Sequence, residues 1–253
     1  MVLQLAVPIA AAVLAVIVFV VGDRVRPSAW RHTEDDSPGA LVVELINTLF
    51  LAVAAFVVVI CWQQYDNAHN HTVAESKALV DVYWAAHGMP EPDHSRIQGL
   101  IKDYTESVVT EEWTTMDRDH KMSQSTQDIL DSLRDTVAAV QSPDSDVTDL
   151  RATALAGLDA VAQARQDRAL DTNLGMPGFL YTALWFTVVL LLFSGVLSGA
   201  AVTLRSVLMT GLLGVVVGTA VLAIYNLDRP FSGGNIVSKD AFELALSRYQ
   251  HIT

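Results

Sequence analysis

Four long apolar runs punctuate this chain, and a long polar, helix-patterned stretch separates the first pair from the second. The runs cover residues 2–22, 45–62, 176–203 and 206–225. Each is near or above the roughly 20 residues that an α-helix needs to cross a bilayer. The pattern predicts an all-α integral membrane protein with two transmembrane helical hairpins, four spans in all, flanking a helical soluble domain.

The helical pattern of the second run continues past its apolar part. No Pro or Gly interrupts residues 40–87, and Gly88-Met89-Pro90 then ends the pattern. At 1.5 Å per residue, one helix over this stretch would be about 70 Å long. We expect it to pass from the bilayer into water.

The polar stretch carries apolar stripes at helical spacing and no alternating strand pattern. Ser142-Pro143-Asp144 breaks these helices, and a short amphipathic helix is expected in the tail, either in the membrane interface or on the soluble domain. The predicted boundaries are a first hairpin at 1–64, an acidic helical domain at 65–176, a second hairpin at 177–226 and the tail at 227–253.

Two GxxxG motifs, Gly195–Gly199 and Gly214–Gly218, lie in the second pair of runs. Small residues allow helices to approach closely in lipid. We expect them to serve packing within the hairpin or bundle, with a dimer face as the alternative.

Charge is concentrated between the two pairs of runs. The 253-residue chain has a net charge of −12, and residues 64–176 hold 20 Asp and Glu against 9 Lys and Arg. This excess of acid argues against a nucleic-acid surface. The single cysteine, Cys61, allows no intrachain disulfide, and no catalytic, phosphate-binding or metal-binding motif occurs. We predict neither an enzyme nor a bound cofactor or metal.

The first run is expected to be a retained span, because it lacks a positive start and a small-residue cleavage pattern. The positive-inside rule then sets the orientation. Arginines of the loops within the hairpins favour placing these loops inside and the soluble domain outside the cytoplasm: Arg24, Arg26, Arg31 and Arg205. Basic residues of the tail oppose this placement: Arg229, Lys239 and Arg248.

Polar residues near the start of the second run are the sharpest candidates for function. Glu44, Asn47 and Thr48 share one helix face, with Leu51 a turn further on. A charge in the bilayer is costly and usually faces a bundle interior or a cavity. The stripe is a candidate pore or ion-site lining. The alternatives are that Glu44 is hydrated at the interface and that Asn47 and Thr48 bond neighbouring helices.

Aromatic and histidine residues follow where this helix leaves the membrane. Trp62 and Tyr65 are either part of an aromatic belt at the membrane surface or candidates for a pore mouth. His69, His71 and Glu75 lie close together further along. They are weak evidence for a metal site, which needs at least three ligands, so a solvated helix face is favoured.

Ordered landmarks over residues 50–246 resemble the bestrophin-like family of bacterial membrane proteins. The most specific is Asp228-Arg229-Pro230-Phe231-Ser232-Gly233 after the fourth run. The others are Phe56, Trp62, Tyr65, Glu75, Tyr83, Tyr104, Glu112-Trp113, Met116, Arg165, Arg168, Pro177 and Trp185. The resemblance implies kinship with bestrophins, which are pentameric chloride channels whose large domain is cytoplasmic.

Four of these landmarks carry opposite charges on different predicted helices: Glu75, Glu112, Arg165 and Arg168. We expect the arginines to pair with the carboxylates inside the helical domain and to fix helix register. A ligand-sensing site is the alternative.

The leading functional hypothesis is an oligomeric ion channel in the cell membrane, lined by the second span. The acidic domain argues against easy access for anions, because clefts of one charge sign concentrate the opposite ion, so cation passage is at least as plausible as chloride passage. The alternative is a non-conducting accessory subunit of a larger membrane complex, or a membrane-anchored sensor. The expected partners are the lipid bilayer and either further copies of the chain or other membrane subunits.

Overall fold

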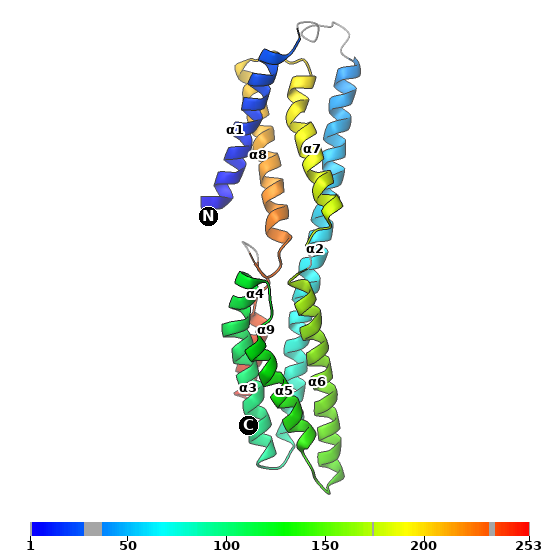
Figure 1. The fold of residues 1–253 in the computed structure, drawn as a ribbon, viewed down its shortest axis with the longest axis vertical. Helices are drawn as coiled ribbons and strands as arrows, with labels where there is room; N and C mark the ends of the chain where they lie inside the picture. Colours follow the sequence, from blue (N-terminus) through cyan, green and yellow to red (C-terminus); the bar gives the residue numbers. More distant parts are fainter. Residues whose placement is uncertain (1, 28–36, 174, 233–235, 253) are drawn as a thin grey trace. The chain divides into compact units, whose positions relative to one another are not determined.

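The chain folds into two compact units, and the computed structural model describes residues 2–27, 37–173, 175–232 and 236–252. One unit comprises residues 1–62 and 175–228, and the other comprises residues 63–174 and 229–253. Every regular element in these described ranges is a helix (Figure 1).

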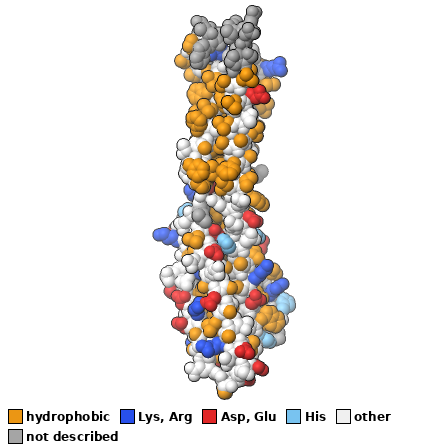
Figure 2. Space-filling model, turned by 90° about the vertical axis from the view of Figure 1, so that its right-hand side faces the viewer, with side chains coloured by type: hydrophobic (Ala, Val, Ile, Leu, Met, Phe, Trp, Pro, Cys, Tyr) orange, Lys and Arg blue, Asp and Glu red, His pale blue; other side chains and the backbone are white. Residues whose placement is uncertain are grey.

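The described residues of the first unit form four helices that are long and apolar enough to cross a membrane. They are α1 (Val2–Val25), the first part of α2 (Ser37–His87), α7 (Gly178–Leu197) and α8 (Leu204–Leu227). Apolar side chains cover these helices on the face drawn in Figure 2. Such a surface suits lipid tails and would be unfavourable in water. We refer to these residues as the membrane unit.

Small residues bring α1 against α8. A Cβ placed on Gly214 would lie 2.6 Å from the Cα of Ala12, and one on Gly218 would lie 2.8 Å from the Cα of Pro8. Gly195 on α7 also faces α1, since a Cβ placed on it would lie 3.1 Å from the ring of Phe19. The glycines therefore pack within the bundle, and their partner is the first span.

Gly199, the last residue of one GxxxG motif, has a different role. Its φ of 71° lies in the left-handed region, one residue beyond the C-cap Ser198 of α7. Glycine is the usual residue at that position, because it adopts this conformation without a Cβ clash. Gly199 thus ends α7 and does not belong to its packing face.

The remaining residues form a second helical bundle, which we call the acidic unit. The predicted long helix is confirmed, since α2 runs without interruption to His87 and supplies helical residues to this unit. The other elements are α3 (Asp93–Ser107), the π-helix η2 (Val108–Glu112), α4 (Trp113–Asp119), α5 (Gln124–Ala139), α6 (Ser145–Asp171) and α9 (Asp240–Tyr249).

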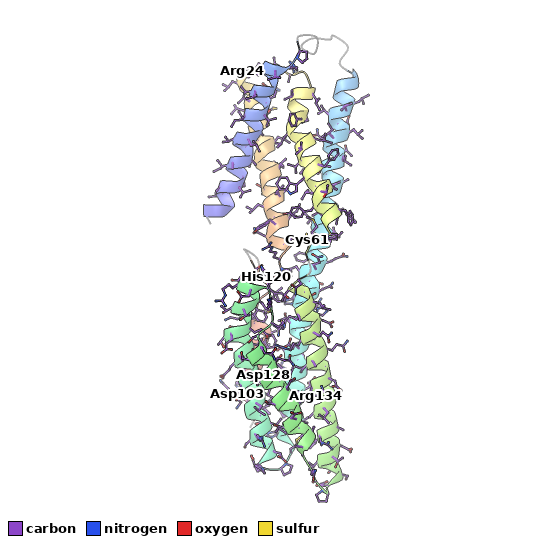
Figure 3. All side chains as sticks on the ribbon, viewed as in Figure 1. Arg24, Cys61, Asp103, His120, Asp128 and Arg134 are labelled. Carbon is purple, nitrogen blue, oxygen red and sulfur yellow. The ribbon has the colours of Figure 1, made fainter. Side chains whose placement is uncertain are left out.

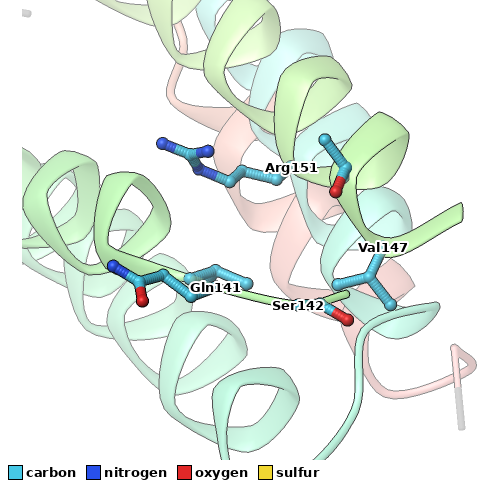
Figure 4. Close-up of a pocket in the computed structure, with 6 residues that line it drawn as sticks. Gln141, Ser142, Val147 and Arg151 are labelled. Atoms are coloured by element: carbon cyan, nitrogen blue, oxygen red, sulfur yellow. The ribbon is translucent and has the colours of Figure 1, made fainter. Parts of the chain in front are cut away.

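The predicted break at Ser142-Pro143-Asp144 separates α5 from α6. Asp144 caps α6 by accepting a hydrogen bond from the backbone N–H of Asp146 at 2.9 Å. A cleft of about 180 Å³ lies at this link, lined by Ser142 and Arg151 (Figure 4). Arg151 donates to the carbonyl of Ala138 at 2.9 Å. The cleft is part of a helix connection.

The tail helix α9 packs on the acidic unit, which decides between the two placements left open by the sequence. Phe242, Ala245 and Tyr249 are buried in its core. The ring of Tyr249 stacks on Tyr83 of α2, with centroids 4.4 Å apart. The apolar face of α9 therefore has a protein partner.

Candidate functional site

The polar stripe of α2 is exposed in the single chain. Glu44, Asn47, Thr48 and Leu51 all lie on the exposed surface of the helix. The Thr48 hydroxyl donates to the carbonyl of Glu44 at 2.9 Å, which is the usual way for a threonine within a helix to satisfy its hydroxyl.

The other face of α2 holds the helix in the membrane unit. Its buried residues recur at helical spacing and pack with residues of α7 and α8: Ile46, Phe50, Ala54, Val57 and Cys61. The three polar side chains of the stripe, and Leu51 beyond them, thus point away from this cluster. They are available to a central pore, to another subunit or to lipid.

The aromatic residues after the stripe differ in exposure. Trp62 is 57% exposed, whereas Tyr65 is partly buried against the core of the acidic unit. An exposed tryptophan at the end of an apolar run suits an aromatic belt. Tyr65 is instead a packing residue in the single chain.

The four predicted charge partners meet inside the acidic unit. Arg165 and Glu112 form a bidentate pair, with N–O distances of 2.7 and 2.6 Å. Arg165 also donates to the hydroxyl of Tyr104 at 3.2 Å, to Gln127 Oε1 at 2.9 Å and to the carbonyl of Ser123 at 3.2 Å. All five N–H groups of this guanidinium are therefore engaged.

Arg168 joins both carboxylates and is fully buried. Its Nε and Nη2 donate to Glu75 at 2.8 and 3.0 Å, and Nη2 also donates to Glu112 at 2.7 Å. The guanidinium lies beside two neighbouring aromatic rings, 5.5 Å from the centroid of Trp113 and 5.6 Å from that of Phe242. These cation–π contacts help to replace the water that the charge has lost.

The cluster contains two positive and two negative side chains, so its formal charges cancel. Burial alone would raise the pKa of Glu112, but the charges of Arg168 and Arg165 outweigh burial and hold this pKa below its ordinary value. Burial and the nearby Glu75 carboxylate raise the pKa of Tyr104, which therefore stays a hydrogen-bond donor to Glu75. The two arginines, the two glutamates and the Tyr104 hydroxyl form a closed, charge-balanced cluster, which we call the brace.

Four helical elements position this brace. Glu75 comes from α2, Tyr104 from α3, Glu112 from η2, and both arginines from α6. The π-helix widens one turn between α3 and α4 and ends at Glu112, which is completely buried. Such bulges often occur at functional positions. Here the π-helical turn carries Glu112, the carboxylate that accepts hydrogen bonds from both Arg165 and Arg168.

The predicted solvated face at His71 and Glu75 is wrong. His69 is exposed, but Glu75 is buried and His71 lies 2.7 Å through Nδ1 from Asp171. The two residues do share a face of α2, and this face packs on α6, where Arg168 and Asp171 are three residues apart. No group of three metal-ligating side chains occurs among the described residues.

Three contacts of this region went unrecognised in the sequence: Gln127 and Ser123, which accept hydrogen bonds from Arg165, and Asp171, which contacts His71. Asp171 had a usable signal, because the spacing Arg165, Arg168, Asp171 puts all three side chains on one face of a helix. Gln127 and Ser123 had none, since their contacts with Arg165 depend on how α5 packs on α6.

The four apolar helices of the described residues define the class of this chain, a multi-pass helical membrane protein. Comparison with known proteins then gives its family. The family model of the Bestrophin-like domain matches residues 9–242, and the chain belongs to this family. No curated protein matches the chain.

Two solved structures share the fold. One is a crystal structure of a bacterial bestrophin homologue from Klebsiella pneumoniae carrying a single mutation. It is 12% identical, has a TM-score of 0.69, and the match covers 99% of this chain and 98% of the other. The second is a crystal structure of a membrane protein variant, 11% identical with a TM-score of 0.68, covering 99% and 97% of the two chains. At these identities the likeness establishes the fold.

Proposed function

We propose that this protein is an ion channel formed by several copies of the chain, with the exposed stripe of α2 lining the pore. Family membership and the shared fold support a membrane ion channel. The observation that carries the finer proposal is the exposed face of α2, which presents a carboxylate, an amide and a hydroxyl within an apolar span: Glu44, Asn47 and Thr48.

Energetics favour a shared pore over lipid for this stripe. An ionised side chain at the centre of a membrane-spanning helix costs about 2.5 kcal/mol or more on insertion scales, and charged residues within spans usually face a bundle interior or an aqueous cavity. Because the opposite face of α2 is already buried against α7 and α8, the stripe can be shielded only by water or by further subunits. A ring of copies around a water-filled axis supplies both.

The proposed permeant ion is a cation. Each copy would place Glu44 in the pore, and rings of carboxylates select cations. The acidic unit adds to this preference. Since the buried brace is neutral, the net excess of 11 acidic side chains over residues 64–176 belongs to the other residues of that region. Such a field attracts cations and repels chloride.

Flux from liposomes tests this proposal. We expect the purified wild-type protein to release a K⁺ gradient, Glu44→Gln to reduce the rate, and Asn47→Ala to alter it. The matched control is Glu106→Gln, which removes an exposed carboxylate from α3. Absence of flux for any ion from well-folded wild-type protein would contradict the channel proposal and favour an accessory subunit or a sensor.

The proposed topology crosses the bilayer in two hairpins, α1 with α2 and α7 with α8. The arginine count places the acidic unit outside the cytoplasm, whereas the bestrophin resemblance implies a cytoplasmic unit. Arg26 is engaged with Asp23 at 3.3 Å and with the carbonyl of Gly199 at 3.1 Å, and Arg31 lies outside the described residues. Because the rule counts Lys and Arg whatever their partners, these two arginines still count, together with Arg24 at the end of α1 (Figure 3) and Arg205.

Cysteine labelling in intact cells tests the topology. Cys61 is fully buried, so wild type provides a low background. Asp103 on α3, shown in Figure 3, is exposed, and Asp103→Cys offers a single reactive site on the acidic unit. Reaction with an impermeant reagent in intact cells supports the extracytoplasmic placement. Reaction only after lysis overturns it.

A further inference from the structure

A cavity of about 320 Å³ lies inside the membrane unit, between α1, α7 and α8. Buried Leu184 and Ile224 are among the residues that line it. Three half-exposed aromatic side chains also line it: Tyr181, Trp185 and Tyr225. The volume is at the lower end of the range for small-molecule sites, about 300–1,000 Å³.

Helical spacing directs these side chains to one place. Tyr181 and Trp185 are four residues apart on α7, and Tyr225 and Asp228 are three residues apart at the end of α8. Residues at these spacings share a helix face. Val7 of α1 also contributes to the lining. The cavity is thus formed by regular helices and does not depend on a loop.

Asp228 supplies the only formal charge among the lining residues. Its Oδ1 accepts a hydrogen bond from the backbone N–H of Met176 at 2.6 Å, which fixes the direction of the carboxylate. Aromatic faces attract organic cations, and a carboxylate beside them supplies a counter-charge. A lining of three aromatic rings and one carboxylate in an apolar cavity is therefore suited to an organic ammonium group.

The cavity lies at one end of the spans. Tyr181 is in the first turn of α7, while Tyr225 and Asp228 are at the C-terminal end of α8. Ends of transmembrane helices lie at the level of lipid head groups, where aromatic belts are common. A belt alone requires neither a cavity nor a carboxylate, and this site has both.

We propose that this cavity binds the ammonium head group of a membrane lipid, choline or ethanolamine, with the first carbons of the lipid against Leu184 and Ile224. The aromatic rings and the Asp228 carboxylate hold the cation, and the apolar lining favours a lipid over a free, hydrated amine. The inference concerns lipid binding alone and does not depend on ion conduction.

Native mass spectrometry tests the proposal on the full chain. The protein is released from nanodiscs that contain equal amounts of phosphatidylcholine and phosphatidylglycerol, and a parallel set contains phosphatidylethanolamine in place of phosphatidylcholine. We expect wild type to retain the ammonium lipid about fivefold more often than phosphatidylglycerol, in keeping with the strength of cation–π contacts.

Two variants remove the proposed recognition by different means. Asp228→Asn removes the charge but keeps an oxygen to accept the Met176 N–H, and Trp185→Leu removes an aromatic face. We expect both to lower the preference toward the bulk ratio at unchanged thermal stability. Phe186→Leu is the control, because Phe186 is the next residue, is 60% exposed and does not line the cavity.

The outcomes separate the possible occupants. Retention of both lipids in the bulk ratio by wild type would overturn the proposal, as would an unchanged preference in both variants. Addition of free choline is the third arm. Loss of the retained lipid at low choline concentration would show that the site takes the free cation, which would also overturn the assignment to a lipid.

Discussion

Replacing Arg168 by Met should destabilise the acidic unit more than any exposed charge change. The side chain is fully buried and joins Glu75 at 2.8 Å to Glu112 at 2.7 Å. Its loss leaves two carboxylates against one remaining guanidinium, that of Arg165. Removing one partner from a buried pair costs about 3–5 kcal/mol, because the other charge stays buried without compensation.

The assay is thermal unfolding of the purified protein, followed by intrinsic fluorescence and by protease resistance. A loss of this size corresponds to a fall of roughly 10 °C in Tm for a chain of this length. The control is a change at Arg134, which is labelled in Figure 3. Arg134→Met breaks an exposed pair with Asp159 and should shift Tm by about 2 °C or less.

A double variant tests the reasoning about charge balance. Combining Arg168→Met with Glu75→Gln restores a neutral cluster and keeps an oxygen to accept the hydroxyl of Tyr104. We expect this double variant to be more stable than Arg168→Met alone. A Tm of Arg168→Met within the range of the Arg134→Met control, or a double variant that loses the sum of its two single changes, would refute the account of the brace.

Further outcomes follow from the pKa of Glu112 and from the glycines. Folding holds the pKa of Glu112 below its ordinary 4.5, so its contribution to stability is present above that pH and is lost as the pH falls through the lowered pKa. Wild type should thus lose Tm more steeply than Glu112→Gln between about pH 5 and pH 3, and parallel curves would contradict this. Gly214→Val should cost about 2 kcal/mol by forcing α8 from the α1 backbone, and an unchanged Tm would contradict this packing. Gly99→Ala meets no atom within 4 Å and should stabilise α3 by about 1 kcal/mol, which a lowered Tm would contradict.

The long helices and the charged residues that pair inside the acidic unit could be predicted from the sequence. Hydrophobic runs require only composition, and an uninterrupted pattern from residue 40 to 87 predicted α2 correctly. The four charges of the brace were named because they are landmarks of the family resemblance with opposite signs on different predicted helices, and the structure pairs them.

Tertiary geometry accounts for what the sequence did not reveal. The sequence does not distinguish the π-helical turn at Val108–Glu112 from an α-helical turn, because the apolar residues around it would have the same spacing in either case. His71 and Glu75 were interpreted as solvated, since their burial depends on α6 packing over that face of α2. The aromatic cavity at Trp185 likewise arises only when three helices meet.

The reversal potential of wild-type protein and Glu44→Gln in a planar bilayer with a KCl gradient tests the central proposal most directly. If Glu44 lines the pore, the wild-type reversal potential should lie close to the equilibrium potential of K⁺. Glu44→Gln should move this potential toward zero, while Glu106→Gln, which removes one of many exposed carboxylates of the acidic unit, should move it far less. An absence of current, or a wild-type selectivity that Glu44→Gln leaves intact, would contradict a pore lined by the stripe of α2.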